Sequence, residues 1–177
     1  TVEACRSFFD TYYSANNIVL VIVGDIDTAE TLARVKEEFG GVRRAESIPR
    51  NPGKVVAQRG ERRSTIYYPV RIPLLYAGWH APKAGAPDGD ALDVASQILS
   101  AGRSSRLYRK LVHENEQALY AEGGYWAMQE AGLFFAVAGV RPGAEIDDVE
   151  AEFFAQIDRM AREPASDAEL AKAKAIL

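Results

Sequence analysis

The clearest fold signal in this chain is the segment ALYAEGGYWAMQEAGLFFAVAGV, residues 118–140. Residues 118–127 and 133–140 are apolar and aromatic runs of strand length, and between them, after Met128, the residues Gln129-Glu130-Ala131-Gly132 favour a turn. Two such runs joined by a four-residue loop are typical of a β-hairpin. The segment therefore predicts two neighbouring antiparallel strands.

Two further strand-like runs precede this hairpin, at residues 65–68 (TIYY) and 74–79 (LLYAGW). Pro69 and Pro73 lie beside them, and a proline cannot donate to a strand ladder, so these runs are expected near an edge of the sheet. They raise the number of expected strands without fixing their order.

Four helices are expected around the hairpin, two before it and two after it. Each begins at a residue suited to capping and shows apolar residues at three- and four-residue spacing or a helix-favouring composition. The expected ranges run from Asp88 or Asp90 to Gly102, from Ser104 or Ser105 through Val112, from Ile146 to Pro164, and from Ala168 to Leu177.

The first 54 residues predict a helix, a strand and a second helix. The β-branched run Ile18–Val23 stops at Gly24-Asp25, which is typical of a central strand buried on both faces. Asp27 or Thr28 caps the helix that follows, and Gly40-Gly41 suits its end. Residues 44–54 contain prolines, a glycine and charges, and we interpret them as a surface connection.

These patterns predict an α+β fold with a mixed, largely antiparallel sheet and helices packed on one face. A chain of 177 residues has room for one well-buried core, so we expect a single domain over residues 1–177.

Composition and charge exclude several classes of function. The chain has 21 basic and 25 acidic residues, and its formal net charge of −4 argues against a nucleic-acid partner, which needs a basic face. The longest apolar runs are far shorter than the roughly 20 residues that span a bilayer, so no membrane span is expected. Cys5 is the single cysteine, which excludes an internal disulfide.

The residues for metal or nucleophilic chemistry are sparse. A catalytic zinc site needs two or three imidazole or carboxylate ligands that converge on one ion, and the chain has only His80 and His113, far apart in sequence. We therefore predict no catalytic residue and no metal ligand in this chain. Residues 102–106 (GRSSR) are compatible with an anion site at a helix start, but helix termination followed by capping explains them more simply.

Three segments together resemble the insulinase/pitrilysin-type zinc metallopeptidases. They are residues 8–25 (FFDTYYSANNIVLVIVGD), residues 90–112 with the motif Gly102-Arg103-Ser104-Ser105-Arg106-Leu107-Tyr108, and residues 166–174 (SDAELAKAK). The second is the most specific, and Ala15 stands where the family usually has proline.

The resemblance implies a non-catalytic domain, one that works beside a separate catalytic zinc domain carrying His-x-x-Glu-His in the same or a partner chain. Such domains help to enclose and bind unfolded peptide substrates, and the zinc belongs to the full-length enzyme. A bacterial, periplasmic setting follows from the family alone. A face made for burial against the partner also makes a homodimer of the isolated chain an expectation.

The resemblance also implies two substrate-binding positions. The family uses an arginine and a tyrosine seven residues apart, and the matching residues here are His113 and Tyr120, with His113 replacing the arginine. A structural role explains His113 equally well, because a cation is favoured near the C-terminal end of a helix and His113 could cap that end. The alternative function is a structural, assembly module like the core subunits of respiratory complexes, without proteolysis.

Overall fold

The computed structural model describes residues 1–50 and 56–177. The chain divides into two compact units, Thr1–Pro52 and Gly53–Leu177, and each is described here by itself. The predicted connection at residues 44–54 lies partly outside the described residues, and the single-domain organisation of residues 1–177 stays a prediction.

The first unit holds α1 (Val2–Tyr12), the short 3₁₀ helix η1 (Ala15–Asn17) and α2 (Thr28–Phe39). The predicted helix boundaries are confirmed: Asp27 Oδ1 accepts a hydrogen bond from the Glu30 amide at 2.8 Å, and Gly40 is the C-cap. Such a cap satisfies one of the amides that a helix start leaves without a partner.

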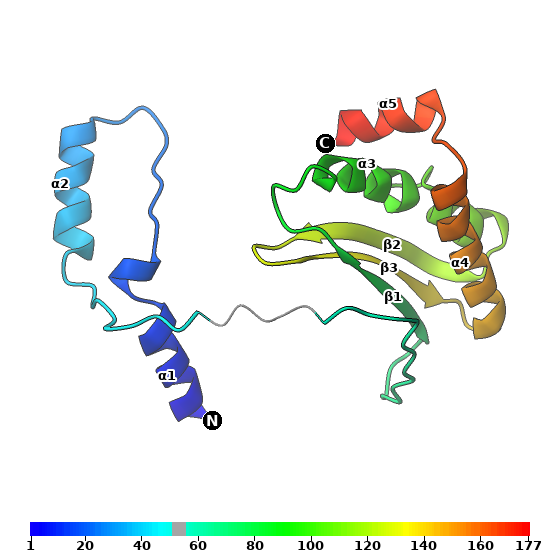
Figure 1. Ribbon diagram of the computed structural model, residues 1–177, viewed down its shortest axis with the longest axis horizontal. Helices are drawn as coiled ribbons and strands as arrows, with labels where there is room; N and C mark the ends of the chain where they lie inside the picture. The colour runs from blue at the N-terminus through cyan, green and yellow to red at the C-terminus, as the bar shows by residue number, and fades with distance from the viewer. Residues whose placement is uncertain (51–55) are drawn as a thin grey trace. The chain divides into compact units, whose positions relative to one another are not determined.

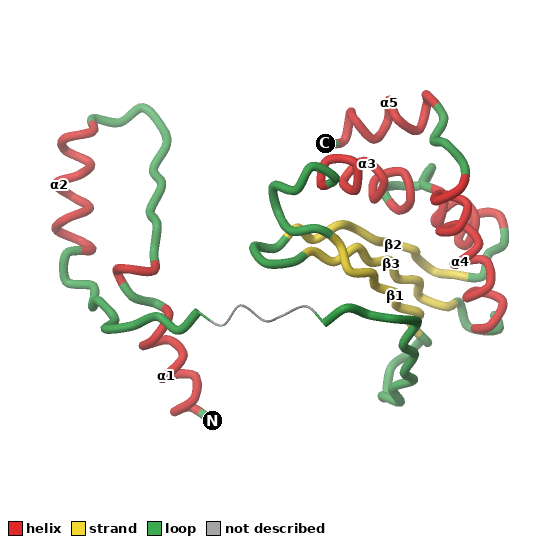
Figure 2. The backbone as a smooth tube through the Cα atoms, in the orientation of Figure 1, coloured by secondary structure: helices red, strands yellow, loops and turns green. Residues whose placement is uncertain are grey.

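The expected central strand at residues 18–23 is not present as a strand. Ile18 has extended dihedral angles, but residues 18–23 join no ladder in the described chain (Figure 2). The prediction was wrong because β-branched residues favour extended backbone, whereas a strand also needs a hydrogen-bonding neighbour.

The second unit is built on a three-stranded antiparallel sheet of β1 (Leu74–Ala81), β2 (Ala118–Ala127) and β3 (Gly132–Val140), in the order β1-β3-β2. The predicted hairpin is confirmed, with Ala127 opposite Gly132 and Tyr125 opposite Phe134. The strand predicted at residues 65–68 is absent, and these residues pair with no described segment. Pro69 follows them directly, and a proline cannot donate a hydrogen bond to a strand ladder.

Helices cover one face of this sheet. The helices α3 (Gly89–Ser100), η2 (Tyr108–Glu114) and α4 (Ile146–Arg162) contact the strands, and α5 (Asp167–Ile176) packs on α3 (Figure 1). The buried core between sheet and helices consists of small and branched side chains around Phe153, which is fully buried. The predicted fold class, α+β with helices on one face of an antiparallel sheet, is confirmed.

The segment η2 is a π-helix, a form that sequence patterns do not reveal. Neither Ser104 nor Ser105 caps it: the structure shows no side-chain cap there, and Ser105 is buried with its hydroxyl unpaired among the described residues. Among the residues that the structure describes, no helix combines the length and the apolar character needed to cross a membrane.

Candidate functional site

The sheet of the second unit has two unlike faces, because side chains alternate along each strand. One face carries the residues packed under the helices, among them Ala77, Ala121, Ala136 and Val140. The other face, here called the open face, carries the intervening residues. From the strand registers these are Leu74, Tyr76, Gly78 and His80 of β1, Leu133, Phe135, Val137 and Gly139 of β3, and Tyr120, Glu122, Gly124 and Trp126 of β2.

Three aromatic rings, one from each strand, form a cluster on the open face. The rings of Tyr76 and Phe135 are stacked, with centroids 5.9 Å apart and planes 6° apart, and the ring of Trp126 lies 4.5 Å from that of Phe135. Tyr76 and Trp126 are both 55% exposed. Large aromatic side chains left this open form an apolar surface that another molecule can cover.

Glycines beneath two aromatic rings of the open face allow those rings to lie close to the sheet. A Cβ atom on Gly139 would lie 2.4 Å from the ring of Tyr120, and one on Gly124 would lie 3.3 Å from the ring of Phe135. Both rings therefore lie across a neighbouring strand, over a position that has no side chain. The result is an aromatic layer that follows the sheet, which suits contact with an extended chain.

The open face has few polar groups. Glu122 and His80 are its ionisable residues apart from the tyrosines, and both side chains are exposed. An apolar layer with one carboxylate and one imidazole at its margins can bind apolar and aromatic groups and hydrogen-bond to a backbone, but it offers no paired nucleophile and base.

The two predicted site residues lie on different elements. Tyr120 is half-buried on β2 and belongs to the open face, directly after the irregularity in pairing between Ala118 and Tyr120. His113 is exposed in the last turn of η2. No hydrogen bond between their side chains is found in the described part of the chain. The role of both residues in substrate binding stays a prediction.

A zinc ion does not fit the residues that the structure describes. Within residues 1–50 and 56–177, no group of three or more His, Cys, Asp or Glu side chains could hold a metal ion. His80 lies on β1 and His113 on η2, and Cys5 is exposed in the first unit.

The motif at residues 102–108 has a structural role instead. Arg106 is buried, and its Nε and Nη2 donate to the two carboxylate oxygens of Glu169 at 2.7 and 3.0 Å. This hydrogen-bonded pair lowers the pKa of Glu169 to about 2 and raises the pKa of Arg106. Glu169 also closes the capping box of α5 with Ser166, so the motif anchors α5 to the rest of the unit.

Sequence reasoning missed Tyr76, Phe135 and Trp126 as site residues. Alternation along the strands could have placed them on a common face once the order β1-β3-β2 was known. Which face the helices cover was not visible in the sequence.

Comparisons with known proteins agree over nearly the whole chain. The sequence matches the family described as peptidase M16 inactive domain over residues 1–177. The zinc protease PqqE of Helicobacter pylori is 25% identical over an alignment of 177 positions, which covers 98% of this chain and 40% of that protein. This chain thus spans less than half the length of that relative.

Two solved structures are similar to this chain over nearly its whole length. A protease from Helicobacter pylori is similar with a TM-score of 0.89 and 25% identity, over 99% of this chain and 43% of that one. A chain in complex III2 from Candida albicans is similar with a TM-score of 0.65 and 17% identity, over 99% of this chain and 42% of that one. The second likeness, at this identity, shows the fold alone.

Proposed function

Because this chain belongs to the peptidase M16 inactive-domain family, we propose that it helps to enclose and bind peptide substrates beside a separate His-x-x-Glu-His zinc domain. The resemblance to insulinase/pitrilysin-type peptidases is confirmed by the family match and by the likeness to a zinc protease. Hydrolysis and zinc belong to the partner domain, in the same or another chain.

The open face is the observation that carries the binding role. It brings Tyr120 into one apolar surface with Tyr76, Phe135 and Trp126, and of these four residues the family likeness had suggested only Tyr120. An unfolded peptide exposes apolar side chains that a folded protein buries, and these are the groups that a low aromatic layer binds. His113 lies outside this face, in the last turn of η2, and its proposed role is a second contact with the substrate.

The test is reconstitution of cleavage. The chain is mixed with the catalytic zinc domain encoded with it, and cleavage of an unstructured fluorogenic peptide is followed with and without a zinc chelator. We expect negligible cleavage by the chain alone and zinc-dependent cleavage by the mixture. Zinc-dependent cleavage by the chain alone that survives substitution of both His80 and His113 would contradict the non-catalytic role.

A matched pair of variants tests the open face itself. Tyr76→Ala removes an exposed ring from the face, whereas Tyr67→Ala removes a ring that is also exposed but lies outside the sheet. We expect Tyr76→Ala to raise KM severalfold with little change in kcat, because it removes ground-state contacts, and Tyr67→Ala to change neither. Equal kinetics for the two variants would remove the open face from the proposal.

The second candidate is a structural module without proteolysis. The fold likeness to a chain of complex III2 favours it, since that match extends over 99% of this chain. Under this alternative the mixture forms a stable complex but cleaves nothing, and no His-x-x-Glu-His motif is found in the protein encoded with this chain.

A further inference from the structure

Of the residues that make up the open face, Glu122 alone carries a carboxylate. It lies on β2, in the row that it forms with Val137 of β3 and Tyr76 of β1. Its side chain is exposed, and none of the ion pairs among the described residues includes it. A carboxylate on an apolar surface with no cation beside it attracts a positively charged group from another molecule.

The open face itself supplies no cation to Glu122. Its basic residue, His80, lies on β1, two strands away, in the row of Leu133 and Trp126. At a strand spacing of about 4.8 Å and a rise of about 3.4 Å per residue, the Cα atoms of Glu122 and His80 are roughly 17 Å apart. Exposed charges at that separation are largely screened by physiological salt, whose Debye length is about 8 Å. Glu122 is therefore free to pair with a group from outside the sheet.

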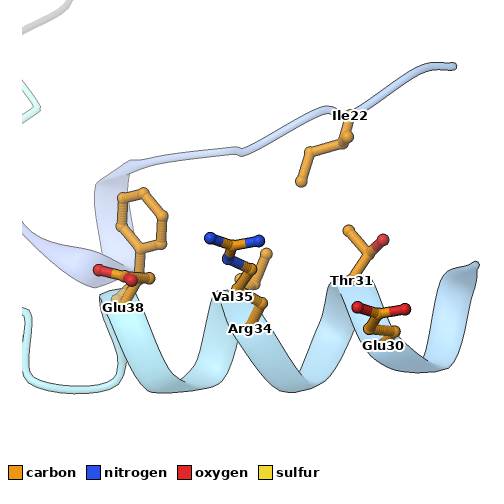
Figure 3. A pocket seen from close by; sticks show the side chains of 7 residues that line it. Ile22, Glu30, Thr31, Arg34, Val35 and Glu38 are labelled. Carbon is orange, nitrogen blue, oxygen red and sulfur yellow. The ribbon is translucent and has the colours of Figure 1, made fainter. Parts of the chain in front are cut away.

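A hollow beside α2 in the first unit shows the opposite arrangement. This hollow, of about 310 Å³, is lined by Glu30 and Glu38, and Arg34 lies between them on the same helix (Figure 3). Residues four apart on a helix are neighbours on its surface, so the hollow holds a cation of its own. The open face, and not this hollow, therefore presents an acidic group that lacks a basic neighbour.

Aromatic rings lie on both sides of Glu122 along β2. The ring of Phe135 lies over Gly124, where a Cβ atom would be 3.3 Å from it, and Tyr120 is two residues away in the other direction. The ring of Trp126 continues the layer, 4.5 Å from that of Phe135. A basic side chain bound to Glu122 would rest its aliphatic stem and its charged end on these rings, which adds cation–π attraction to the ion pair.

Arginine fits this surface better than lysine. Its flat guanidinium stacks on aromatic rings and at the same time donates two parallel hydrogen bonds to one carboxylate. The ammonium of lysine is a compact, strongly hydrated charge that gains less from a ring surface. Glu122 is exposed, so its carboxylate is open to the paired geometry that arginine prefers.

We propose that the open face selects peptide segments in which an arginine stands among apolar residues, and that Glu122 binds the guanidinium. This inference rests on the proposed function, because it names the class of peptide that the same surface binds. In this arrangement Tyr76, Phe135 and Trp126 contact the apolar part of the peptide, and Glu122 sets the specificity.

Cleavage of two matched peptides tests the proposal. Both are unstructured fluorogenic peptides with the same apolar residues, and they differ at one position, which is arginine in one and citrulline in the other. Citrulline keeps the length and the flat end group of arginine but carries no charge. In the mixture of the chain with the catalytic zinc domain encoded with it, we expect KM to be about tenfold higher for the citrulline peptide, with kcat within about twofold.

A matched pair of variants assigns the preference to Glu122. Glu122→Gln removes the carboxylate from the open face, whereas Glu130→Gln makes the same change of charge at an exposed residue in the loop between β2 and β3. We expect Glu122→Gln to raise KM for the arginine peptide about tenfold without affecting the citrulline peptide, and Glu130→Gln to keep the preference. Glu122→Lys should reverse it, so that a peptide with glutamate at the variable position has a lower KM than the arginine peptide.

Each outcome decides the proposal. A preference for the arginine peptide that is lost in Glu122→Gln and kept in Glu130→Gln supports it. If the mixture cleaves both peptides with equal KM, if Glu122→Gln keeps the preference, or if both glutamine variants lose it equally, the role of Glu122 is overturned and the proposed function stands. If the mixture cleaves neither peptide, both are overturned.

Discussion

The ion pair between Arg106 and Glu169 makes the most quantitative prediction, through the variant Glu169→Gln. Glutamine at this position can still close the capping box with Ser166, so the substitution removes mainly the charge. It leaves the buried guanidinium of Arg106 opposite a neutral amide, with Nη1 already unpaired among the described residues. We expect the second unit to lose stability at neutral pH.

The pKa of Glu169 gives the size of the effect. A fall from 4.5 to about 2 corresponds to about 3.4 kcal/mol at about 1.4 kcal/mol per pKa unit. Part of that fall comes from hydrogen bonds with Ser166 that glutamine keeps, and the Glu169 side chain is 27% exposed, which weakens the charge interaction. The expected loss for Glu169→Gln is therefore about 2–3 kcal/mol.

The same shift predicts a pH dependence. A carboxyl whose pKa is lowered by folding stabilises the folded state above its unfolded pKa, here near 4.5, and loses that contribution as the pH falls toward about 2. By this relation the contribution at pH 3 is about 1.4 kcal/mol. The difference between the original chain and Glu169→Gln should shrink to less than half between pH 6 and pH 3.

Urea unfolding followed by tryptophan fluorescence measures this difference. Both tryptophans, Trp79 and Trp126, lie in the second unit, so the signal reports the unit that contains the ion pair. Glu163→Gln is the control: Glu163 also favours the charged form of Arg106, but it is 53% exposed and pairs with Arg159. We expect the control to cost less than about 0.5 kcal/mol. Equal losses for the two variants, or a loss for Glu169→Gln that is constant from pH 6 to pH 3, would refute the reasoning.

Three other substitutions give separate checks on the second unit, all measured by urea unfolding. Gly139→Ala should cost about 1–3 kcal/mol, because its Cβ would lie 2.4 Å from the Tyr120 ring, and combining it with Tyr120→Ala should recover part of that loss. Phe153→Ala should cost about 3–5 kcal/mol, since the side chain is fully buried in the core; a loss below about 1 kcal/mol would contradict that packing. Ser166→Ala should cost about 1 kcal/mol by opening the capping box of α5, and an unchanged midpoint would show that the cap contributes nothing.

Local patterns predicted most of the second unit. The hairpin of β2 and β3 followed from two apolar runs and a four-residue turn, and α3, α4 and α5 followed from apolar spacing and their end signals. These features depend on residues that are close in sequence. Residues 18–23 show the limit, because their composition predicts extended backbone while a ladder needs a partner that no local pattern supplies.

Of the residues on the open face, the sequence predicted only the one that the family likeness indicated. Tyr120 came from that likeness, whereas Tyr76 and Trp126 share a face with it through a strand order that brings β1 and β2 to either side of β3. The role of Arg106 was missed for a similar reason. Its partner Glu169 is 63 residues away, and only the capping box around that partner could be recognised from sequence.

Glu169 also constrains how sequences with this fold can diverge. Its two oxygens accept hydrogen bonds from Arg106 and from both the amide and the hydroxyl of Ser166. A substitution that removes one charged partner leaves the other charge without compensation. A sequence in which only one of the two residues has changed is therefore less stable than a sequence in which both or neither have changed. We therefore expect positions 106 and 169 to be exchanged together in evolution, as a new ion pair or as two apolar residues, and an aligned set of relatives in which they vary independently would contradict this.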